Sequence, residues 1–205
     1  MIISLVNQKG GVGKTTIAIN MTSRLSQSKQ KFLLIDADPQ GSVLQWQSVK
    51  GNTRFDVLHH PGATFHRDIK ELAHGYNHVV IDAPPAIGQI TRSVLIVSHL
   101  AIVPICPSPL DIWSGTEIIS LIQEAKQHNP KLRARLLISK KIPTTRIGRE
   151  AKQALETYKI PIFRTEICQR IAYVEAMIAG LSVLEYAADS EAATEIKELC
   201  SELAK

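Results

Sequence analysis

The sequence lacks the features that mark several common protein classes. Its 205 residues hold only three cysteines, Cys106, Cys168 and Cys200, spaced too widely for a CxxC pair or a metal-ligand pattern. Reduced structural thiols are therefore expected, in the cytoplasm. The longest apolar runs fall short of 18 residues, so we expect no membrane-spanning helix. The first apolar segment starts at Ile2, so we also expect no signal peptide.

Linkers, internal repeats and low-complexity tracts are also missing from the sequence. Hydrophobic residues make up 44% of the chain, which is enough material for one core. We therefore expect a single domain over residues 1–205.

The net charge of +5 is unevenly distributed along the chain. Residues 1–125 hold ten Lys or Arg against nine Asp or Glu, whereas residues 126–170 hold twelve against three. Residues 171–205 are acidic, with two against seven. A basic block inside a folded domain is typical of a polyanion-binding surface, although a solvated helix face gives similar spacing.

Apolar runs bounded by turn residues alternate with segments of helical spacing. The expected strands are 2–6, 32–35, 55–58, 78–81, 100–105, 134–139 and 162–164. The expected helices are 14–28, 64–73, 114–128, 146–158 and 188–203. This alternation predicts an α/β fold with a mostly parallel twisted sheet flanked by helices on both faces. Ligands of such sheets bind at the carboxyl ends of the strands.

The motif KGGVGKTT, residues 9–16, stands between the first expected strand and the first expected helix. In that context the glycines let backbone N–H groups approach a phosphate, and the helix N-terminus faces the same anion. Lys14 is placed to reach the β- and γ-phosphates, and the Thr15 hydroxyl to bind Mg²⁺. This motif, together with the alternating strands and helices, indicates the P-loop NTPase type of fold. We expect these residues to bind the nucleotide: Gly10, Gly11, Val12, Gly13, Lys14, Thr15 and Thr16.

Two acidic motifs follow later strands. LLIDADPQG, residues 33–41, ends a strand in Asp36 and Asp38, and HVVIDAPP, residues 78–85, ends another in Asp82. Either motif alone is weak evidence of a functional site, because Asp is common in turns. Coming after a P-loop in this order, they predict carboxylates beside a bound metal nucleotide.

KGGVGKTT resembles the deviant Walker A motif of the ParA/MinD family, ATPases that position plasmids, chromosomes and other cargo in bacterial cells. The resemblance covers nearly the whole chain, and its specific motifs lie in the first 115 residues. It implies ATP and Mg²⁺ as cofactors and an ATP-dependent homodimer. It also implies that Lys9 reaches across the dimer interface to the nucleotide of the other subunit.

The same resemblance implies roles for the acidic residues. Asp38 corresponds to the residue that polarises the attacking water, which makes Lys9, Lys14 and Asp38 the expected catalytic set. Asp36 is implied to lie near the water shell of Mg²⁺, and Asp82 to hold a metal-bound water. The loop at 103–111 is implied near the adenine and the dimer interface, and the segment 138–143 near the base edge. For both segments ordinary loop chemistry is the alternative.

Members of the ParA group bind DNA non-specifically through basic residues near the C-terminus. Such contacts need only clustered cations. The resemblance therefore extends to the basic block, where Arg149, Lys152 and Arg170 are the candidate DNA contacts.

The sequence lacks the cysteine pairs of iron–sulfur relatives, a terminal tyrosine cluster and the basic membrane helix of MinD. It also lacks an N-terminal helix-turn-helix extension. We therefore expect a small ParA-type partition ATPase, associated with the nucleoid and not the membrane, stimulated by a ParB-type partner. Two alternatives stay open, namely positioning of another cargo, such as carboxysomes or chemoreceptor clusters, and a polymerising scaffold controlled by nucleotide.

Overall fold

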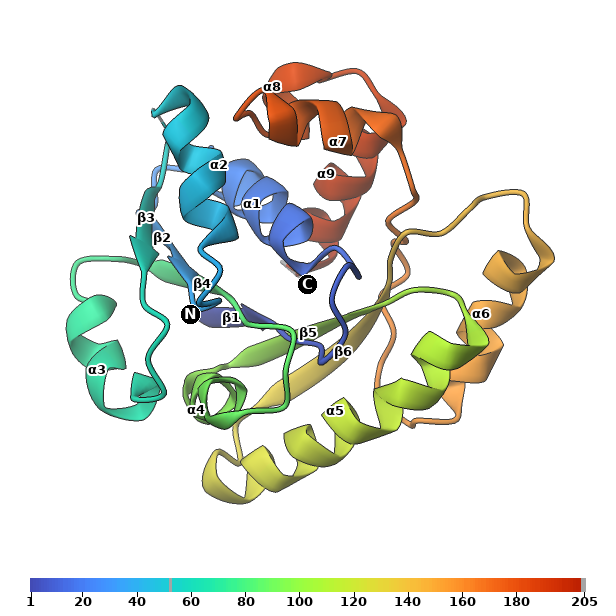
Figure 1. Ribbon diagram of the computed structural model, residues 1–205, viewed down its shortest axis with the longest axis horizontal. Coiled ribbons are helices and arrows are strands. Elements are labelled where there is room, and N and C mark those ends of the chain that lie inside the picture. Colours follow the sequence, from blue (N-terminus) through green and yellow to red (C-terminus); the bar gives the residue numbers. More distant parts are fainter. Residues whose placement is uncertain (52, 204–205) are drawn as a thin grey trace.

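A parallel β-sheet runs through the centre of the protein (Figure 1). The computed structural model describes residues 1–51 and 53–203, and of residues 146–149 it describes the backbone alone. The strands are β1 (Ile2–Leu5), β2 (Phe32–Asp36), β3 (Asp56–His59), β4 (His78–Asp82), β5 (Leu100–Ile105) and β6 (Arg133–Ile138). They form one six-stranded sheet in the order β3-β2-β4-β1-β5-β6, and every pair is parallel.

Helices cover both faces of this sheet. They are α1 (Lys14–Leu25), α2 (Ser42–Lys50), α3 (Phe65–Leu72), α4 (Gln89–Val97), α5 (Pro109–His128), α6 (Arg146–Glu156), α7 (Ile171–Ile178), α8 (Val183–Tyr186) and α9 (Glu191–Leu203). In Figure 1, α1, α2, α7, α8 and α9 lie above the sheet, and α4 and α5 lie below it. The expected fold class is confirmed.

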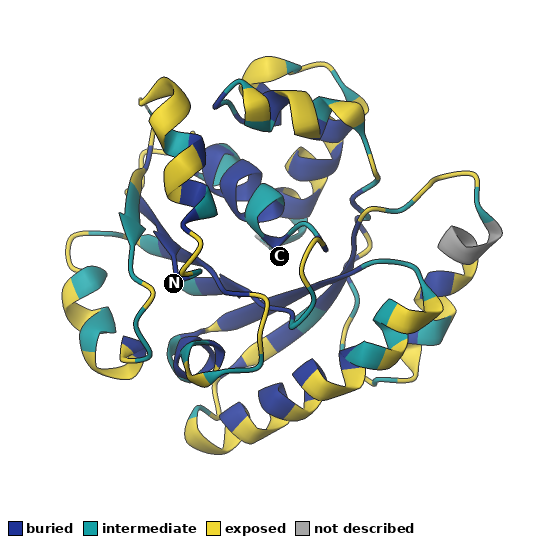
Figure 2. Cartoon of the chain, in the orientation of Figure 1, coloured by how far each residue is buried: buried dark blue, intermediate teal, exposed yellow. Residues whose placement is uncertain are grey.

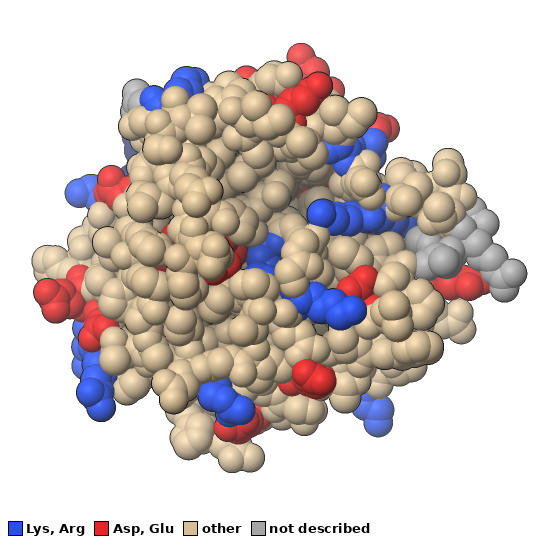
Figure 3. Space-filling model, in the orientation of Figure 1, with Lys and Arg blue, Asp and Glu red and all other residues tan. Residues whose placement is uncertain are grey.

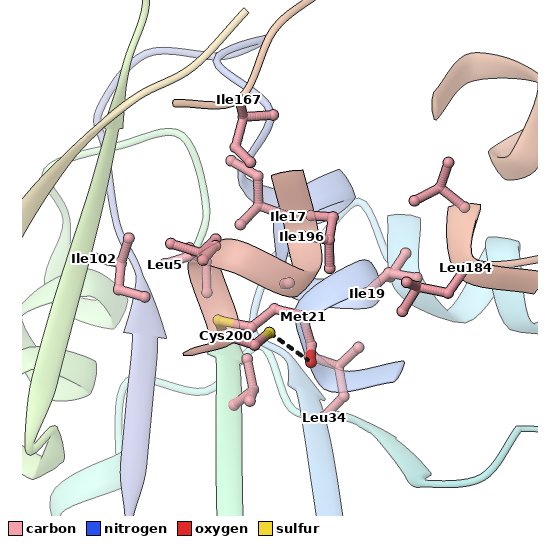
Figure 4. Close-up of a cluster of buried hydrophobic side chains, with 14 of the residues drawn as sticks. Leu5, Ile17, Ile19, Met21, Leu34, Ile102, Ile167, Leu184, Ile196 and Cys200 are labelled. Carbon is pink, nitrogen blue, oxygen red and sulfur yellow. Dashed lines mark hydrogen bonds between the residues drawn. The ribbon is translucent and has the colours of Figure 1, made fainter. Parts of the chain in front are cut away.

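Two hydrophobic clusters, one on each face, hold these layers together. One joins the sheet to α1, α2, α7 and α9, with Leu5, Ile17, Met21 and Ile196 among its fully buried side chains (Figure 4). The other packs α3, α4, α5 and α6 against the opposite face. The central strands are buried on both faces (Figure 2), as expected for a parallel sheet between two helical layers.

The seventh expected strand, at 162–164, was wrong. This segment makes only an isolated parallel bridge, between Leu136 and Ile162. Pro161 has no N–H to donate, which limits pairing at its start. Four of the described helices, α2, α4, α7 and α8, were not anticipated. Among the described residues, no helix has the length and apolarity needed to cross a membrane.

The connections place a crevice at the carboxyl end of β1. After β1 the chain passes over the position of β4 and forms β2 and β3 on one side of β1. Strands β5 and β6 lie on the other side of β1. Such a reversal of strand order opens a space for a ligand. Asp36 and Asp82 end β2 and β4, which are neighbours in the sheet, and the two residues pair directly in register.

Candidate functional site

The loop between β1 and α1 has the backbone conformation that phosphate binding requires. Gly11 and Gly13 have φ angles of 74° and 92°, in the left-handed region that favours glycine. Gly13 is the N-cap residue of α1, and within the described part of the chain no side chain caps this N-terminus. The N–H groups of this first turn are therefore available to an anion, which the helix dipole also favours.

Lys14 lies inside this loop and bridges its two ends. Its side chain is largely buried, and Nζ donates a hydrogen bond to the carbonyl of Lys9 at 3.0 Å. Burial lowers the pKa of Lys14, while the charges of Asp82 and Asp38 raise it. A cation held in a partly dry loop beside two carboxylates is suited to binding a phosphate.

Asp82 faces the P-loop from the end of β4. The Thr15 hydroxyl donates to its Oδ2 at 2.6 Å, whereas its buried Oδ1 has no hydrogen-bond partner among the described residues. Burial raises the pKa of Asp82 to about 7, and the Thr15 hydrogen bond opposes that shift. An unpartnered buried carboxylate oxygen is costly, so this site is incomplete without a cation or water.

Asp36 anchors the loop that carries Asp38. It is fully buried, and its Oδ2 accepts from the backbone N–H of Val43 at 2.8 Å, in the first turn of α2. Its Oδ1 accepts from the N–H of Asp38 at 3.2 Å. Burial raises the pKa of Asp36, and these backbone donors oppose the shift. Both oxygens thus fix the turn after β2.

Asp38 itself lies two residues beyond the end of β2 and is half-buried. Its Oδ1 accepts from the N–H of Gln40 at 3.0 Å, and its carbonyl accepts from the N–H of Gly41 at 3.0 Å. Gly41 has a φ of 65° and closes this turn. The turn therefore holds the carboxylate at the same edge of the sheet as the P-loop.

Lys9 points away from the P-loop and toward α5. Its ammonium group lies 3.2 Å from Oδ1 of Asp111 and donates to the carbonyl of Leu110 at 3.3 Å. Figure 3 shows Lys and Arg side chains gathered near the centre of this face, beside the β1–α1 loop, with acidic side chains among them.

A cavity of about 410 Å³ opens beside the P-loop. It is lined by residues of the loop and α1 (Val12, Gly13, Thr16 and Ile17), by Ser139 and Lys140 after β6, and by apolar side chains of α7. The buried Ser139 hydroxyl has no partner of standard geometry among the described residues, apart from a weak interaction with the Cys106 thiol. Lys140 has a left-handed φ of 51°, which is strained for a non-glycine residue.

The candidate DNA contacts differ in their surroundings. Lys152 is exposed on α6, and the side chain of Arg149 lies outside the described residues. Arg170 binds two carboxylates of α9, donating from Nε to Glu195 at 2.7 Å and forming an ion pair with Glu191. Its charge is therefore already compensated within the chain.

Two contributors to the site were missed in the sequence: His59 and the α7 wall of the cavity. Asp111 belongs to the segment 103–111, which was expected near the site, but its pairing with Lys9 was not anticipated. Ser108 caps α5, with Pro109 at the first helical position, so the sequence SPLD does carry a helix-start signal that places Asp111 in the first turn. No sequence motif marks His59 or α7. The position of His59 depends on the register of β3 against β2, and the position of α7 depends on its packing against α2.

Comparison with known proteins gives consistent matches over nearly the whole chain. The sequence profile described as the CobQ/CobB/MinD/ParA nucleotide binding domain matches residues 3–183. Maintenance of carboxysome distribution protein A from Halothiobacillus neapolitanus is 32% identical, over 98% of this chain and 95% of the relative. The chromosome-partitioning ATPase Soj from Thermus thermophilus is 27% identical, over 98% and 94%.

Solved structures show the same fold. Apo McdA from Cyanothece superposes with a TM-score of 0.82 at 18% identity, covering 98% of both chains. A putative plasmid partition protein from Borrelia burgdorferi, bound to AMPPNP, gives 0.81 at 18% identity, covering 99% and 98%. Septum site-determining MinD from Pyrococcus horikoshii, complexed with Mg-ADP, gives 0.77 at 20% identity, covering 100% and 96%.

Proposed function

This chain belongs to the CobQ/CobB/MinD/ParA nucleotide-binding family, and from that premise we propose that it is an ATPase that positions a cargo through cycles of ATP binding, dimerisation and hydrolysis. One observation carries the proposal. Lys14 and Thr15 stand at the N-terminus of α1, and Asp82 lies beside them; among the described residues no side chain caps this helix end, and one buried oxygen of Asp82 has no partner. This arrangement suits a nucleoside triphosphate with its divalent cation.

The donor set fits Mg²⁺. The described residues contain no group of three or more His, Cys, Asp or Glu side chains that could hold a metal alone. Mg²⁺ could bind the Thr15 hydroxyl directly and Oδ1 of Asp82 through a water molecule. Phosphate oxygens of the nucleotide would supply further ligands. Asp36 is the second candidate for contact through water. Bound Mg²⁺ would neutralise charge on the phosphates during hydrolysis.

We assign the hydrolytic step to Asp38 and Lys14. Asp38 would orient the attacking water with its carboxylate, which the turn at 38–41 holds at the sheet edge. Lys14 would balance the charge that develops on the phosphates. The N–H groups of residues 10–16 would bind the same phosphates through the backbone.

We assign the nucleobase to the cavity beside the P-loop. Its walls are mostly apolar, and it joins Gly13 and Thr16 to the segment after β6. The Ser139 hydroxyl is one of the polar groups in its lining that could contact a base edge, beside Thr16 and Gln169. A base bound there would bury apolar side chains that are otherwise exposed to water, which favours binding.

Lys9 would act in trans. We propose that it leaves Asp111 and contacts the nucleotide of a second copy of the chain, so that ATP links dimerisation to catalysis. The dimer would bind DNA through exposed cations of the basic block, with Lys152 and Arg149 as candidates. Arg170 is the weaker candidate, because Glu191 and Glu195 already pair with it.

For the cargo, we keep two proposals apart. A ParB-type partner and DNA cargo agree with the likeness to Soj. A protein assembly as cargo is favoured by two relatives named for carboxysome distribution, which are 32% and 30% identical over 98% of this chain. The hydrolysis rate measured with each class of purified adaptor separates the two, because only the true adaptor should stimulate it.

The activity itself is tested by phosphate release from Mg-ATP. The wild-type protein should hydrolyse ATP slowly and stop when EDTA removes the cation. Lys14→Ala should bind no ATP and release no phosphate, because the loop loses the cation that is placed to reach the β- and γ-phosphates. Lys29→Ala, on an exposed turn, is the matched control and should behave as the wild type. Unchanged ATP affinity in Lys14→Ala would refute the nucleotide site.

A further inference from the structure

His59 ends β3 next to the turn that carries Asp38. Strands β2 and β3 pair with Asp36 opposite His59, and the N–H of His60 donates to the carbonyl of Asp36 at 2.9 Å. This pairing places the half-buried His59 ring over the neighbouring turn. Nε2 of the ring lies 3.0 Å from the carbonyl oxygen of Asp38 and 3.8 Å from where a Cβ on Gly41 would stand.

The chemistry of this contact fixes its direction. A backbone carbonyl only accepts hydrogen bonds, so Nε2 of His59 must carry the proton and donate it. The same carbonyl accepts the N–H of Gly41. The backbone of Asp38 is therefore tied both within its own turn and to the neighbouring strand β3.

We propose that His59 is a positioning residue for hydrolysis, which holds the Asp38 turn so that the carboxylate stays aimed at the water it orients. The inference rests on the role of Asp38 in the proposed function. A carboxylate on a surface turn has freedom that a strand residue lacks, and small misplacements of such a group are costly to a reaction. The hydrogen bond from His59 removes part of that freedom without touching the substrate.

The neighbouring histidine provides a matched control. The ring of His60 meets Phe65 edge-on at 4.9 Å, and its Nε2 lies 3.2 Å from Oδ2 of Asp68. Phe65 and Asp68 belong to α3. His60 therefore packs on a helix, whereas His59 packs on the Asp38 turn. Substitution of His60 tests general damage to the end of β3.

The test compares kcat and KM for ATP among four proteins: wild type, His59→Phe, His59→Gln and His60→Phe. Phenylalanine keeps a ring over Gly41 but has no N–H, whereas glutamine keeps an N–H at a similar reach. Loss of one hydrogen bond should lower kcat of His59→Phe about three- to tenfold. KM should stay the same, because the ring does not touch the phosphate loop. His59→Gln and His60→Phe should retain the wild-type kcat.

A second arm asks whether His59 acts through Asp38. In an Asp38→Ala background, adding His59→Phe should cause no further loss, since the group that it positions is gone. Melting curves and ATP affinity identify any variant that misfolds. If His59→Phe misfolds, the kcat of His59→Gln shows whether an N–H donor at this position is sufficient for normal hydrolysis.

The outcomes separate the two proposals. A wild-type kcat in His59→Phe, an equal loss in His59→Phe and His59→Gln, or a further loss in the Asp38→Ala background overturns the positioning role and leaves the proposed function intact. Undiminished hydrolysis by Asp38→Ala instead overturns the assigned role of Asp38, and the positioning role of His59 fails with it.

Discussion

The ammonium group of Lys9 forms an ion pair with the Asp111 carboxylate of its own chain, at 3.2 Å. Asp111 stands in the first turn of α5, and its Oδ2 accepts from the hydroxyl of the capping residue Ser108. Gln8, the residue before Lys9, donates from its side-chain amide to the carbonyl of Ser114 at 2.7 Å. The first half of the P-loop is thus tied to α5. A Lys9 that serves a second subunit must first leave this partner.

Two substitutions at this pair should have opposite effects. Lys9→Ala should bind ATP as a monomer and fail both to dimerise and to hydrolyse, because the residue proposed to reach the second nucleotide is gone. Asp111→Asn should dimerise at lower ATP concentration, because it weakens the internal ion pair. The pair is partly exposed, so the gain is at most about 1 kcal/mol, or about fivefold.

Sedimentation across an ATP series, with ADP alongside, measures both effects. Lys29→Ala is again the control, since it removes an exposed lysine outside the site. Normal ATP-dependent dimers from Lys9→Ala would refute the trans role. Weaker dimerisation by Asp111→Asn would instead mean that Asp111 contacts the second subunit.

Features that depend on a short stretch of sequence could be predicted from the sequence alone. The sequence placed the glycine loop after β1 and the start of α1 at Lys14, as the structure has them, because glycine spacing and a helix start are local signals. Strand ends at Asp36 and Asp82 were likewise readable, and parallel pairing brought them to one sheet edge. The alternating apolar runs correctly indicated a sheet covered on both faces.

Contacts set by strand register or by packing between distant segments could not be predicted. His59 meets Asp38 only because β3 lies beside β2, which no single segment encodes. Arg170 was expected at a DNA surface, yet α9 supplies two carboxylates from more than 20 residues away. The expected strand at 162–164 had the right composition, but it makes only one bridge to β6.

Asp38→Ala should separate ATP binding from ATP hydrolysis. The phosphate contacts stay in place, whereas the group proposed to orient water is lost, so hydrolysis should fall by about a hundredfold or more. The ATP-bound dimer should then accumulate. Phosphate release and sedimentation in ATP measure both effects, with the exposed Asp189→Ala as control. Rapid turnover by Asp38→Ala would transfer the assignment to Asp36.

Asp82 should make the ligand-free protein less stable as pH rises. Its folded pKa, about 7, lies above the usual 3.8, so the folded state holds the proton more tightly than the unfolded state between these values. The free energy of unfolding therefore falls as pH rises through about 4 to 7, by up to about 1.4 kcal/mol per unit of pKa shift.

Asp82→Asn keeps an oxygen acceptor for Thr15 and removes the charge. The variant should gain melting temperature over the wild type at pH 8 and gain little at pH 4.5. Calorimetry at both pH values, without nucleotide or Mg²⁺, makes the comparison, and Glu117→Gln on the exposed side of α5 is the control. An equal gain at both pH values would show that packing, and not the buried charge, causes the effect.

DNA binding should depend on nucleotide and on salt. Residues 126–170 hold twelve of the basic residues, but one subunit can offer only a few phosphate contacts at once. Pairing two subunits doubles those contacts on one surface, and counterion release makes affinity depend steeply on their number. Retention on DNA should therefore require ATP, ignore base sequence and weaken strongly between about 50 and 200 mM salt.

Charge-removing variants identify the surface within that measurement. Lys152→Ala should weaken DNA retention and flatten its salt dependence while ATP-driven dimers form normally, because this exposed lysine on α6 is remote from the P-loop in sequence. Lys50→Ala, at the end of α2, removes the same charge outside the basic block and should retain DNA. Arg170→Ala should mainly lower the melting temperature, since it leaves Glu191 and Glu195 without their partner. Equal losses in Lys152→Ala and Lys50→Ala would mean that net charge alone governs retention, and equal retention with ATP, ADP and no nucleotide would remove the link to dimerisation.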